Sequence, residues 1–360
     1  MRVGVDAHLL PPGQGYRAAG VAVYVEQLIR RLPRVAPGLE FLFFTPPGWE
    51  MAGAVPSRLP TSRPLTRIAW EQAAAPVLAR RWKLDVTHGP VNVLPLLSTT
   101  RGVVTVHDLA FLKYPKAFRR SRDVYLRLVV GASVRKAAAV ITPSRSTRED
   151  VIEHFGVDLE KVHVIPLGVD EHYQHSGPVD APLDGPYVLY AGTLEPRKNV
   201  PLLLRAFAEL RRLGYPHRLA LVGGPGWKYR GVFELISRLG IEDAVVAPGF
   251  VEDLLPWYNR ADLFIYPSVY EGFGLPPLEA MACGTPVITS SAGSLGEVVD
   301  DAALTFPPYD QEALLALIRS VLDNRETAER LRALGPQRAA QFPWDETARQ
   351  TAAVYESLLT

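Results

Sequence analysis

Short runs of β-branched and aromatic residues alternate with longer stretches of helical periodicity along the whole chain, and this alternation is its most constraining feature. Each short run is bounded by Gly, Pro or Asp, as buried strands usually are. Strands separated by helices form βαβ units, in which consecutive strands lie parallel and helices cover the sheet. The sequence therefore predicts an α/β fold built on parallel sheets.

The alternation runs twice through the chain, once in each half. In the first half we expect strands at Val3–Asp6, Glu40–Phe44, Val86–His88, Val103–His107, Ala138–Thr142 and Val162–Ile165, and helices at Val21–Arg34, Thr66–Arg81, Ser121–Lys136 and Ser146–Phe155. In the second half we expect strands at Tyr187–Ala191, Arg218–Val222, Ala244–Ala247, Leu263–Tyr266, Pro286–Thr289 and Leu304–Phe306, and helices at Pro201–Leu213, Gly231–Leu239, Leu254–Asn259, Pro277–Ala282, Gly296–Val299 and Gln311–Asn324. Ser144 precedes one of these helices and can cap it.

The chain of 360 residues is long enough for two domains of ordinary size. Proline-rich sequence from Pro166 to Pro186 interrupts the periodicity and predicts a linker. We therefore expect an N-terminal domain over residues 1–168 and a C-terminal domain over residues 169–343. The tail, residues 344–360, is expected to form a helix that packs back toward the N-terminal domain.

Composition excludes several classes of protein. The net charge of +1 gives no reason to expect nucleic-acid binding. The single cysteine excludes a disulfide framework. The start has too short an apolar run for a signal peptide, and no apolar run reaches membrane-spanning length, so we expect a cytoplasmic protein. Residues 1–168, however, carry 23 Lys and Arg against 13 Asp and Glu. The basic stretch from Lys113 to Lys136 is either a core helix with a solvated arginine face or a surface helix that contacts anionic lipid headgroups or a phosphate-bearing acceptor.

The densest motif lies between Glu271 and Glu279 and reads Glu-Gly-Phe-Gly-Leu-Pro-Pro-Leu-Glu. It follows a predicted strand and enters a helix, with Glu279 expected in the first helical turn. Glycines let the backbone approach a ligand closely, and free N–H groups at a helix start suit a phosphate. A purely structural link between strand and helix would explain Glu279 and the prolines, but not the second carboxylate, the glycines and the aromatic residue.

A second motif, Gly192 to Asn199, places Arg197 and Lys198 directly after another predicted strand. Ligands of open α/β sheets bind at the carboxyl ends of strands, where adjacent cations can hold phosphate oxygens. Alone, such a pair is usually solvated surface. Its occurrence in the same domain as the Glu271 motif favours a phosphate site.

Together these motifs resemble retaining glycosyltransferases of family 4 (group 1). Glu271 to Glu279 is similar to the Glu-x7-Glu signature of that family, and Gly192 to Asn199 to its donor-diphosphate loop. The resemblance extends over nearly the whole chain and implies the GT-B architecture, two facing Rossmann-like domains with an interdomain cleft. The Glu195–Asn199 segment is similar to mannosyl-type members. Such enzymes carry no cofactor, and the donor substrate is a nucleoside-diphosphate sugar such as GDP-mannose or a UDP-hexose.

The resemblance also implies roles for the donor-site residues. Arg197 and Lys198 would bind the diphosphate, and Glu279 would bind the ribose hydroxyls. Glu271 would hold the sugar ring together with the loop that follows it. That loop consists of Gly272, Phe273, Gly274 and Leu275, whose N–H groups would bind a phosphate oxygen.

Three further residues take roles from the same resemblance. His107 would face the sugar from the first domain, Gly20 would approach the donor phosphate and the acceptor, and Val251 would lie in the base-binding loop. The family's usual Gly-x-Gly-Arg-Tyr loop reads Gly20-Val-Ala-Val-Tyr here, and Thr193 stands where some members carry Arg. His8 and His88 are candidates for cleft residues or structural histidines.

The implied reaction is transfer of a hexose to a glycan or lipid-linked acceptor in cell-envelope synthesis, with peripheral contact of the basic domain to the inner face of the membrane. The sequence has no Asp-x-Asp metal motif, and we expect no metal. Donor phosphate oxygens would accept the acceptor proton on the same face, or Glu271 would act covalently. Alternatives are an NAD(P)-dependent oxidoreductase, although no Gly-x-Gly-x-x-Gly follows the first strand, and a non-enzymatic two-lobed sugar-binding protein.

Overall fold

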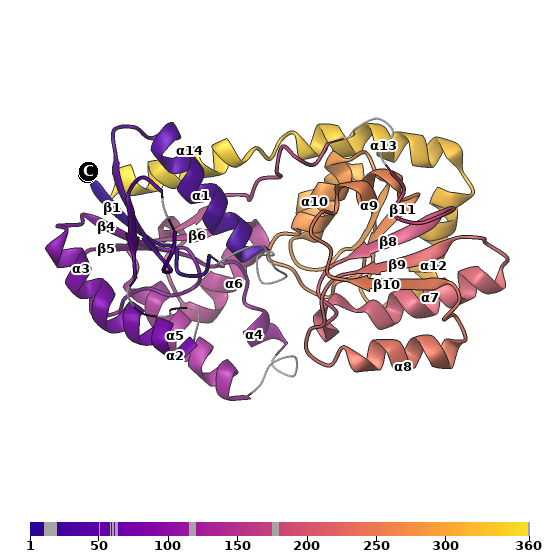
Figure 1. Ribbon diagram of the computed structural model, residues 1–360, viewed down its shortest axis with the longest axis horizontal. Coiled ribbons are helices and arrows are strands. Elements are labelled where there is room, and N and C mark those ends of the chain that lie inside the picture. The colour runs from indigo at the N-terminus through magenta and orange to yellow at the C-terminus, as the bar shows by residue number, and fades with distance from the viewer. Residues whose placement is uncertain are drawn as a thin grey trace. The chain divides into compact units, whose positions relative to one another are not determined.

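The computed structural model describes residues 1–10, 20–49, 51–57, 59, 61, 64–114, 120–174 and 180–358, with the backbone alone at 64, 65 and 120–125. The described residues form two compact units. The first comprises residues 1–114, 120–168 and 344–358, and the second comprises residues 169–174 and 180–343. In both units a sheet is flanked by helices (Figure 1). Among the described helices, none has the length and apolarity needed to cross a membrane.

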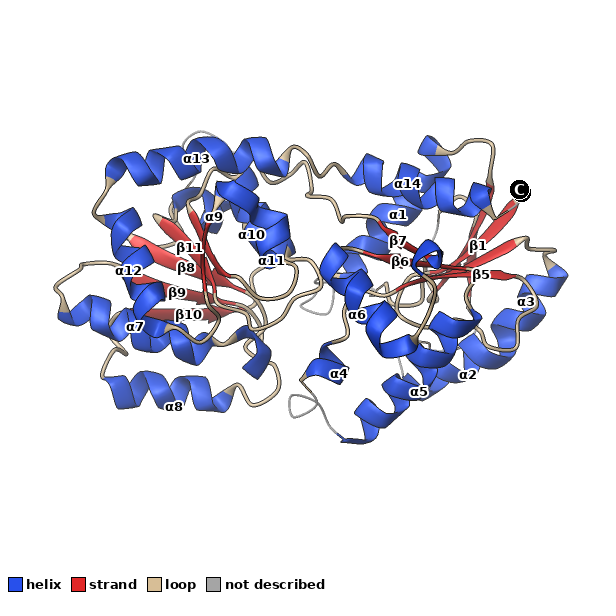
Figure 2. Cartoon of the chain, turned by 180° about the vertical axis from the view of Figure 1, so that it is seen from behind, coloured by secondary structure: helices blue, strands red, loops and turns tan. Residues whose placement is uncertain are grey.

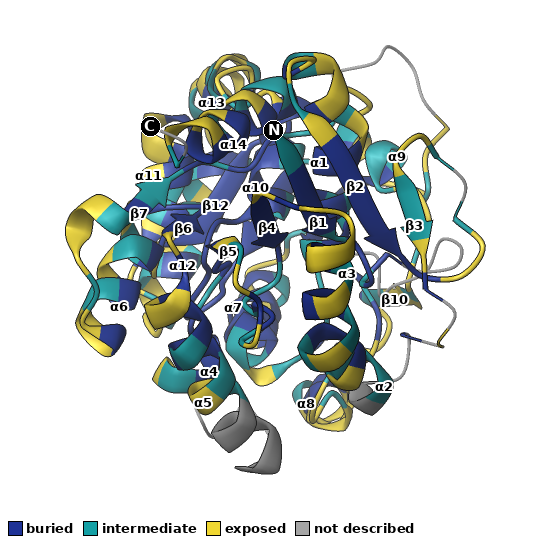
Figure 3. Ribbon diagram, turned by 90° about the vertical axis from the view of Figure 1, so that its left-hand side faces the viewer, coloured by how far each residue is buried: buried dark blue, intermediate teal, exposed yellow. Residues whose placement is uncertain are grey.

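The first unit is built on a seven-stranded parallel sheet in the order β3-β2-β1-β4-β5-β6-β7. Its strands are β1 (Arg2–Asp6), β2 (Glu40–Thr45), β3 (Ala54–Pro56), β4 (Val86–Gly89), β5 (Arg101–Thr105), β6 (Ala139–Thr142) and β7 (Val162–Val164). Strands β1, β2 and β4 are largely buried along their length (Figure 3), because helices cover both faces of the sheet.

The helices of the first unit connect these strands and pack on the sheet. They are α1 (Val21–Val35), α2 (Pro64–Ala69), α3 (Ala75–Arg81), α4 (Ala110–Lys113), α5 (Arg120–Lys136), α6 (Arg145–Phe155) and α14 (Trp344–Ser357). A π-helical segment, Trp70–Ala74, joins α2 to α3, and a 3₁₀ turn spans Leu159–Lys161. Helices α1 and α14 lie on one face of the sheet, and α2, α3 and α5 lie on the other (Figure 2).

The last helix, α14, packs against α1 in the first unit. Arg34 Nη2 lies 2.5 Å from Asp345 Oδ1, which links the two helices at the surface. Deeper in the unit, the Tyr355 hydroxyl lies 2.7 Å from His88 Nδ1, so α14 also satisfies a buried histidine at the end of β4. The chain therefore returns to the first unit after completing the second.

The second unit holds a six-stranded parallel sheet in the order β10-β9-β8-β11-β12-β13. Its strands are β8 (Tyr187–Ala191), β9 (Arg218–Val222), β10 (Val245–Gly249), β11 (Leu263–Tyr266), β12 (Val287–Ser290) and β13 (Leu304–Phe306). Its helices are α7 (Val200–Arg212), α8 (Arg230–Leu239), α9 (Leu255–Arg260), α10 (Leu275–Ala282), α11 (Leu295–Val299), α12 (Gln311–Leu322) and α13 (Arg325–Ala339), with 3₁₀ turns at Pro196–Lys198 and Asp300–Ala302.

The predicted elements are found within a few residues of their expected bounds. The expected cap of α6 is confirmed, because Ser144 Oγ accepts a hydrogen bond from the Thr147 N–H at 3.1 Å. The sequence did not predict β3, α4 and α13. Helix α13 contains Gly335 and Pro336, which ordinarily disfavour a helix. Packing overrides that preference: a Cβ at Gly335 would lie 2.9 Å from the Met281 carbonyl oxygen, so the missing side chain lets α13 approach α10 closely.

Candidate active site

The candidate site lies where three adjacent strands of the second unit end. The loops after β8, β11 and β12 meet there because these strands are neighbours in the sheet. The loop after β8 carries Arg197 and Lys198 in its 3₁₀ turn, and the loop after β11 carries Glu271. Carboxyl ends of parallel strands are the usual ligand-binding edge of such sheets.

Glu271 bridges the two cations of the neighbouring loop. Its Oε2 lies 2.7 Å from Arg197 Nη1, and its Oε1 lies 2.6 Å from Lys198 Nζ. The Ser268 hydroxyl donates a third hydrogen bond to Oε1 at 2.6 Å. The loops are further fastened because the Arg197 guanidinium donates to the Tyr270 carbonyl at 2.8 Å. The structure thus brings together the two motifs that the sequence placed apart by more than seventy residues.

Two members of this ion cluster are buried, which strengthens the interaction between their charges. Glu271 and Lys198 are each 8% exposed. Burial alone would raise the pKa of Glu271, but the charges of Arg197 and Lys198 outweigh it and hold that pKa at about 2. The carboxylate is therefore ionised throughout the neutral range and cannot serve as a general acid.

Lys198 is held by a buried aromatic group as well as by the carboxylate. Its Nζ donates to the Tyr266 hydroxyl and lies 4.9 Å from the centre of the Tyr266 ring. Tyr266 belongs to β11, so the position of this ammonium is fixed by a strand as well as by a loop. Arg197 is held in turn by Glu195, whose Oε1 lies 2.9 Å from Nη2.

The loop after Glu271 presents backbone donors beside the ion cluster. Within the described parts of the chain, the N–H groups of Phe273, Gly274 and Leu275 have no acceptor. The next two residues are prolines, which carry no N–H, so the donors of this helix start are confined to these residues. Gly274 has φ +119°, a conformation that favours glycine. Free amides next to two cations form an arrangement suited to an anion.

The loop between β12 and α11 packs against the Glu271 loop. The Ser294 Oγ lies 3.0 and 2.8 Å from the carbonyl oxygens of Glu271 and Phe273, so its hydroxyl can donate to either of them. Gly293 has φ +60°, and a Cβ there would lie 2.6 Å from the Glu271 carbonyl oxygen. The close approach of these two loops depends on the absence of a side chain.

Replacing Gly293 with alanine is therefore expected to displace the Glu271 loop. The left-handed backbone costs about 1–2 kcal/mol for a non-glycine residue, and the contact with a backbone oxygen adds to it. We expect a lower urea midpoint and a weaker response to nucleotide in thermal-shift titrations. Gly296→Ala in α11 is the matched control, since a Cβ there has open space. Equal effects of both variants would contradict this role of Gly293.

Glu279 lies apart from the ion cluster, and its position corrects one expectation. Because α10 begins at Leu275, Glu279 falls in the second helical turn and not in the first. Its Oε2 accepts a hydrogen bond from the Tyr258 hydroxyl at 3.0 Å. Burial raises the pKa of Glu279 to about 7, with the Tyr258 hydrogen bond opposing the shift and Asp170 adding to it. Glu279 is the site residue whose charge changes near neutrality.

The other expected residues lie elsewhere. Val251 follows β10, at the edge of the sheet in the second unit, and is half-buried. Gly20 directly precedes α1 in the first unit, with φ +63° and open space around it. His107 lies two residues beyond the end of β5, where the sequence predicted a strand. Its Nε2 lies 2.8 Å from the Pro90 carbonyl, so Nε2 carries the proton and Nδ1 is left as the acceptor.

The first unit holds a buried group of titratable side chains, of which the sequence singled out His8 but not Glu71. His8 Nδ1 lies 2.8 Å from Asp6 Oδ1, and the His8 ring packs 3.8 Å from Trp70. Burial and the neighbouring charge of Asp6 raise the pKa of Glu71 to about 8. The π-helical segment at Trp70–Ala74 places Glu71 there, and single π turns are frequent at functional sites. No residue pattern in the chain signals that irregularity.

Within the described ranges, no group of three His, Cys, Asp or Glu side chains has the arrangement needed to hold a metal ion.

Ser268, Ser294 and Tyr258 complete the candidate site although sequence reasoning did not single them out. Ser268 lies two residues after a predicted strand, whereas Ser294 lies five residues after one and carries no local signal.

Comparison with known proteins identifies the class. The family model of glycosyl transferases group 1 matches residues 174–338, and that of glycosyltransferase family 4 matches residues 18–173. Over 293 residues the chain is 36% identical to O-antigen chain mannosyltransferase B of Escherichia coli, an alignment that covers 78% of this chain and 76% of that protein. It is 30% identical to D-inositol 3-phosphate glycosyltransferase of Streptomyces scabiei, over 97% of this chain and 88% of that one.

A solved structure has the same fold. Sucrose-phosphate synthase of Thermosynechococcus elongatus superimposes with a TM-score of 0.81 at 25% identity, over 99% of both chains. The chain belongs to the family 4, group 1 glycosyltransferases, and its two Rossmann-like units have the GT-B fold. It is a glycosyltransferase of glycan synthesis, and the comparisons give no support to the oxidoreductase alternative.

Proposed function

We propose that this protein transfers mannose from GDP-mannose to a sugar or lipid-linked acceptor, with retention of the anomeric configuration. The observation that carries the proposal is the Arg197–Glu271–Lys198 cluster beside three amides that have no acceptor among the described residues. The relationship to O-antigen chain mannosyltransferase B supports mannose as the transferred sugar.

The proposed chemistry rests on charge at the leaving group. As the bond between the anomeric carbon and the donor breaks, negative charge develops on the departing diphosphate. Arg197, Lys198 and the amides of Phe273, Gly274 and Leu275 would stabilise that charge, and fixed donors of this kind act strongly in a buried site. These groups supply the neutralisation that a divalent ion supplies in other transferases, so we expect transfer to persist in EDTA.

Glu271 is assigned to sugar binding and to positioning the cations. An ionised carboxylate has about four lone-pair positions. Lys198, Ser268 and Arg197 take three of them and the Tyr266 hydroxyl also hydrogen-bonds the carboxylate, so a sugar hydroxyl would share an oxygen with one of these partners. A carboxylate held by two cations, with its pKa near 2, is a weak nucleophile. This favours the same-face route, in which a donor phosphate oxygen accepts the proton of the acceptor hydroxyl, over a covalent glycosyl-enzyme.

The first unit is assigned to the acceptor. His107, with Nδ1 as an acceptor, and Gly20 are the residues proposed to act there on the sugar and the acceptor. A peripheral membrane contact is proposed for α5, where Arg127, Leu128 and Arg135 are exposed. Cosedimentation with vesicles rich in anionic lipid tests that contact.

Binding and transfer with defined donors test the proposal. GDP-mannose should raise the melting temperature by several degrees at saturating concentration, more than UDP-glucose or NADH, because ligand that binds only the native state stabilises it. Radiolabelled mannose should then pass to lipid-linked sugars, with and without EDTA. A larger rise in melting temperature with NADH than with GDP-mannose would contradict a transferase. A larger rise with UDP-glucose would contradict GDP-mannose as the donor and mannose as the transferred sugar.

A further inference from the structure

A pocket of about 410 Å³ opens at the end of the second unit's sheet opposite to the candidate active site. It is lined by residues that precede β8, β11 and β12, whereas Arg197 and Glu271 follow β8 and β11. Helix α10 runs between the two ends, from Leu275 beside the ion cluster to the turn at Gly284 and Thr285 that borders the pocket. The pocket is thus separate from the donor residues.

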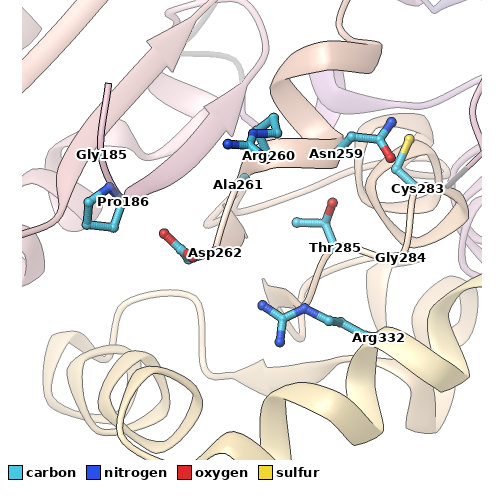
Figure 4. Close-up of a pocket in the computed structure, with 10 residues that line it drawn as sticks. All are labelled: Gly185, Pro186, Asn259, Arg260, Ala261, Asp262, Cys283, Gly284, Thr285 and Arg332. Atoms are coloured by element: carbon cyan, nitrogen blue, oxygen red, sulfur yellow. The ribbon is translucent and has the colours of Figure 1, made fainter. Parts of the chain in front are cut away.

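Two guanidinium groups border this pocket. Arg260 ends α9 and Arg332 lies in α13, and the two side chains come from opposite sides of the space in Figure 4. Within the described ranges, neither makes a hydrogen bond or an ion pair. Arginine presents a rigid set of donors that matches the oxygens of phosphate and carboxylate.

Asp262 gives the pocket a second chemical character. Its Oδ2 accepts the Tyr187 N–H at 2.9 Å, while Oδ1 has no hydrogen-bond partner among the described residues. A free carboxylate oxygen accepts hydrogen bonds from hydroxyl groups. Two guanidiniums against one carboxylate leave the pocket with a net positive charge, so a ligand with both an anionic group and hydroxyls complements it.

We propose that this pocket binds a phosphorylated sugar. Arg260 and Arg332 hold the phosphate, and Asp262 accepts hydrogen bonds from the sugar hydroxyls. The volume lies near the lower end of the range for small-molecule sites, roughly 300–1,000 Å³, which suits a hexose monophosphate. The site is independent of the donor proposed above, because it shares no residue with the ion cluster.

Calorimetric titration of the full chain with glucose 6-phosphate tests the proposal. We expect saturable binding, weaker binding of inorganic phosphate and none of glucose. Arg260→Ala and Arg332→Ala should each weaken glucose 6-phosphate binding about tenfold or more, since each removes a charge-assisted contact. Asp262→Asn should weaken glucose 6-phosphate more than inorganic phosphate.

Arg330→Ala is the matched control. Arg330 is exposed on the same helix, and residues two apart on a helix point in different directions. It should leave binding unchanged, and Arg332→Ala should leave basal transfer unchanged. Equal binding to Arg330→Ala and Arg332→Ala would overturn the proposal. So would an absence of binding, or binding lost with Lys198→Ala and retained in both pocket variants, which would locate the ligand at the ion cluster.

Discussion

Replacing Lys198 with methionine is expected to lower the rate of sugar transfer by about 10²–10³-fold, the effect typical of removing one donor to developing negative charge. The same change should lower the free energy of unfolding by about 3–5 kcal/mol, because it leaves the Glu271 carboxylate buried beside one cation fewer. Methionine keeps an apolar chain of similar length, so packing around Tyr266 is preserved.

The double variant Lys198→Met with Glu271→Gln separates catalysis from stability. It removes both charges of the buried pair, and neutral replacement of a buried pair often restores stability. We expect the urea midpoint to recover toward that of the wild type while transfer stays low, since the cation that meets the diphosphate is still missing. Recovery of transfer in the double variant would show that Lys198 serves only to neutralise Glu271. Wild-type transfer by folded Lys198→Met would refute the diphosphate role directly.

The approach of these two motifs was predictable in part. Each follows a strand, and parallel strands bring their carboxyl ends to one edge of a sheet. The sequence does not give the strand order, so it could not tell that β8 and β11 are neighbours and that Glu271 bridges both cations. The sequence analysis assigned Arg197 and Lys198 to phosphate binding and Glu271 to sugar binding as separate roles. In the structure Glu271 forms ion pairs with both cations.

The parts that escaped prediction depend on packing between distant segments. Ser294 supports the Glu271 loop from beyond β12, and Tyr258 reaches Glu279 from α9. Neither contact has a local pattern. The π-helical turn that buries Glu71 is likewise invisible in a sequence that reads as ordinary helix. Helix α13 supplies Arg332 to the pocket, and this helix was not predicted because Gly335 and Pro336 disfavour a helix.

Glu279→Gln is expected to change how donor affinity depends on pH. The carboxyl of Glu279 has a pKa of about 7 in the free protein, against an ordinary value of 4.5. If ribose hydroxyls bind the carboxylate, proton loss must precede binding below pH 7. Donor affinity should then rise about tenfold between pH 6 and 8 in the wild type. The variant should show no such rise and about tenfold or more weaker binding at pH 8, because a hydrogen bond to a charged group is lost.

The stability of the free protein supplies an independent readout with a definite sign. The folded pKa of Glu279 is raised, so the folded state holds a proton that the unfolded state releases. This contribution is full below about pH 4.5 and is lost as the pH rises through 7, a change of up to about 3 kcal/mol. Glu279→Gln cannot lose that proton and should be the more stable protein at pH 8, although it binds donor less well.

Tyr258→Phe tests the titration of Glu279 by removing the hydroxyl that donates a hydrogen bond to it. The Tyr258 hydroxyl lowers the pKa of Glu279 by donating to it, so its removal should move the midpoint of the affinity profile to higher pH. A nucleoside-diphosphate sugar is the ligand to use, because its phosphates keep fixed charges over this range whereas a free diphosphate terminus titrates. An affinity profile that is the same in wild type, Glu279→Gln and Tyr258→Phe would remove Glu279 from the donor site and leave its raised pKa as a property of the fold.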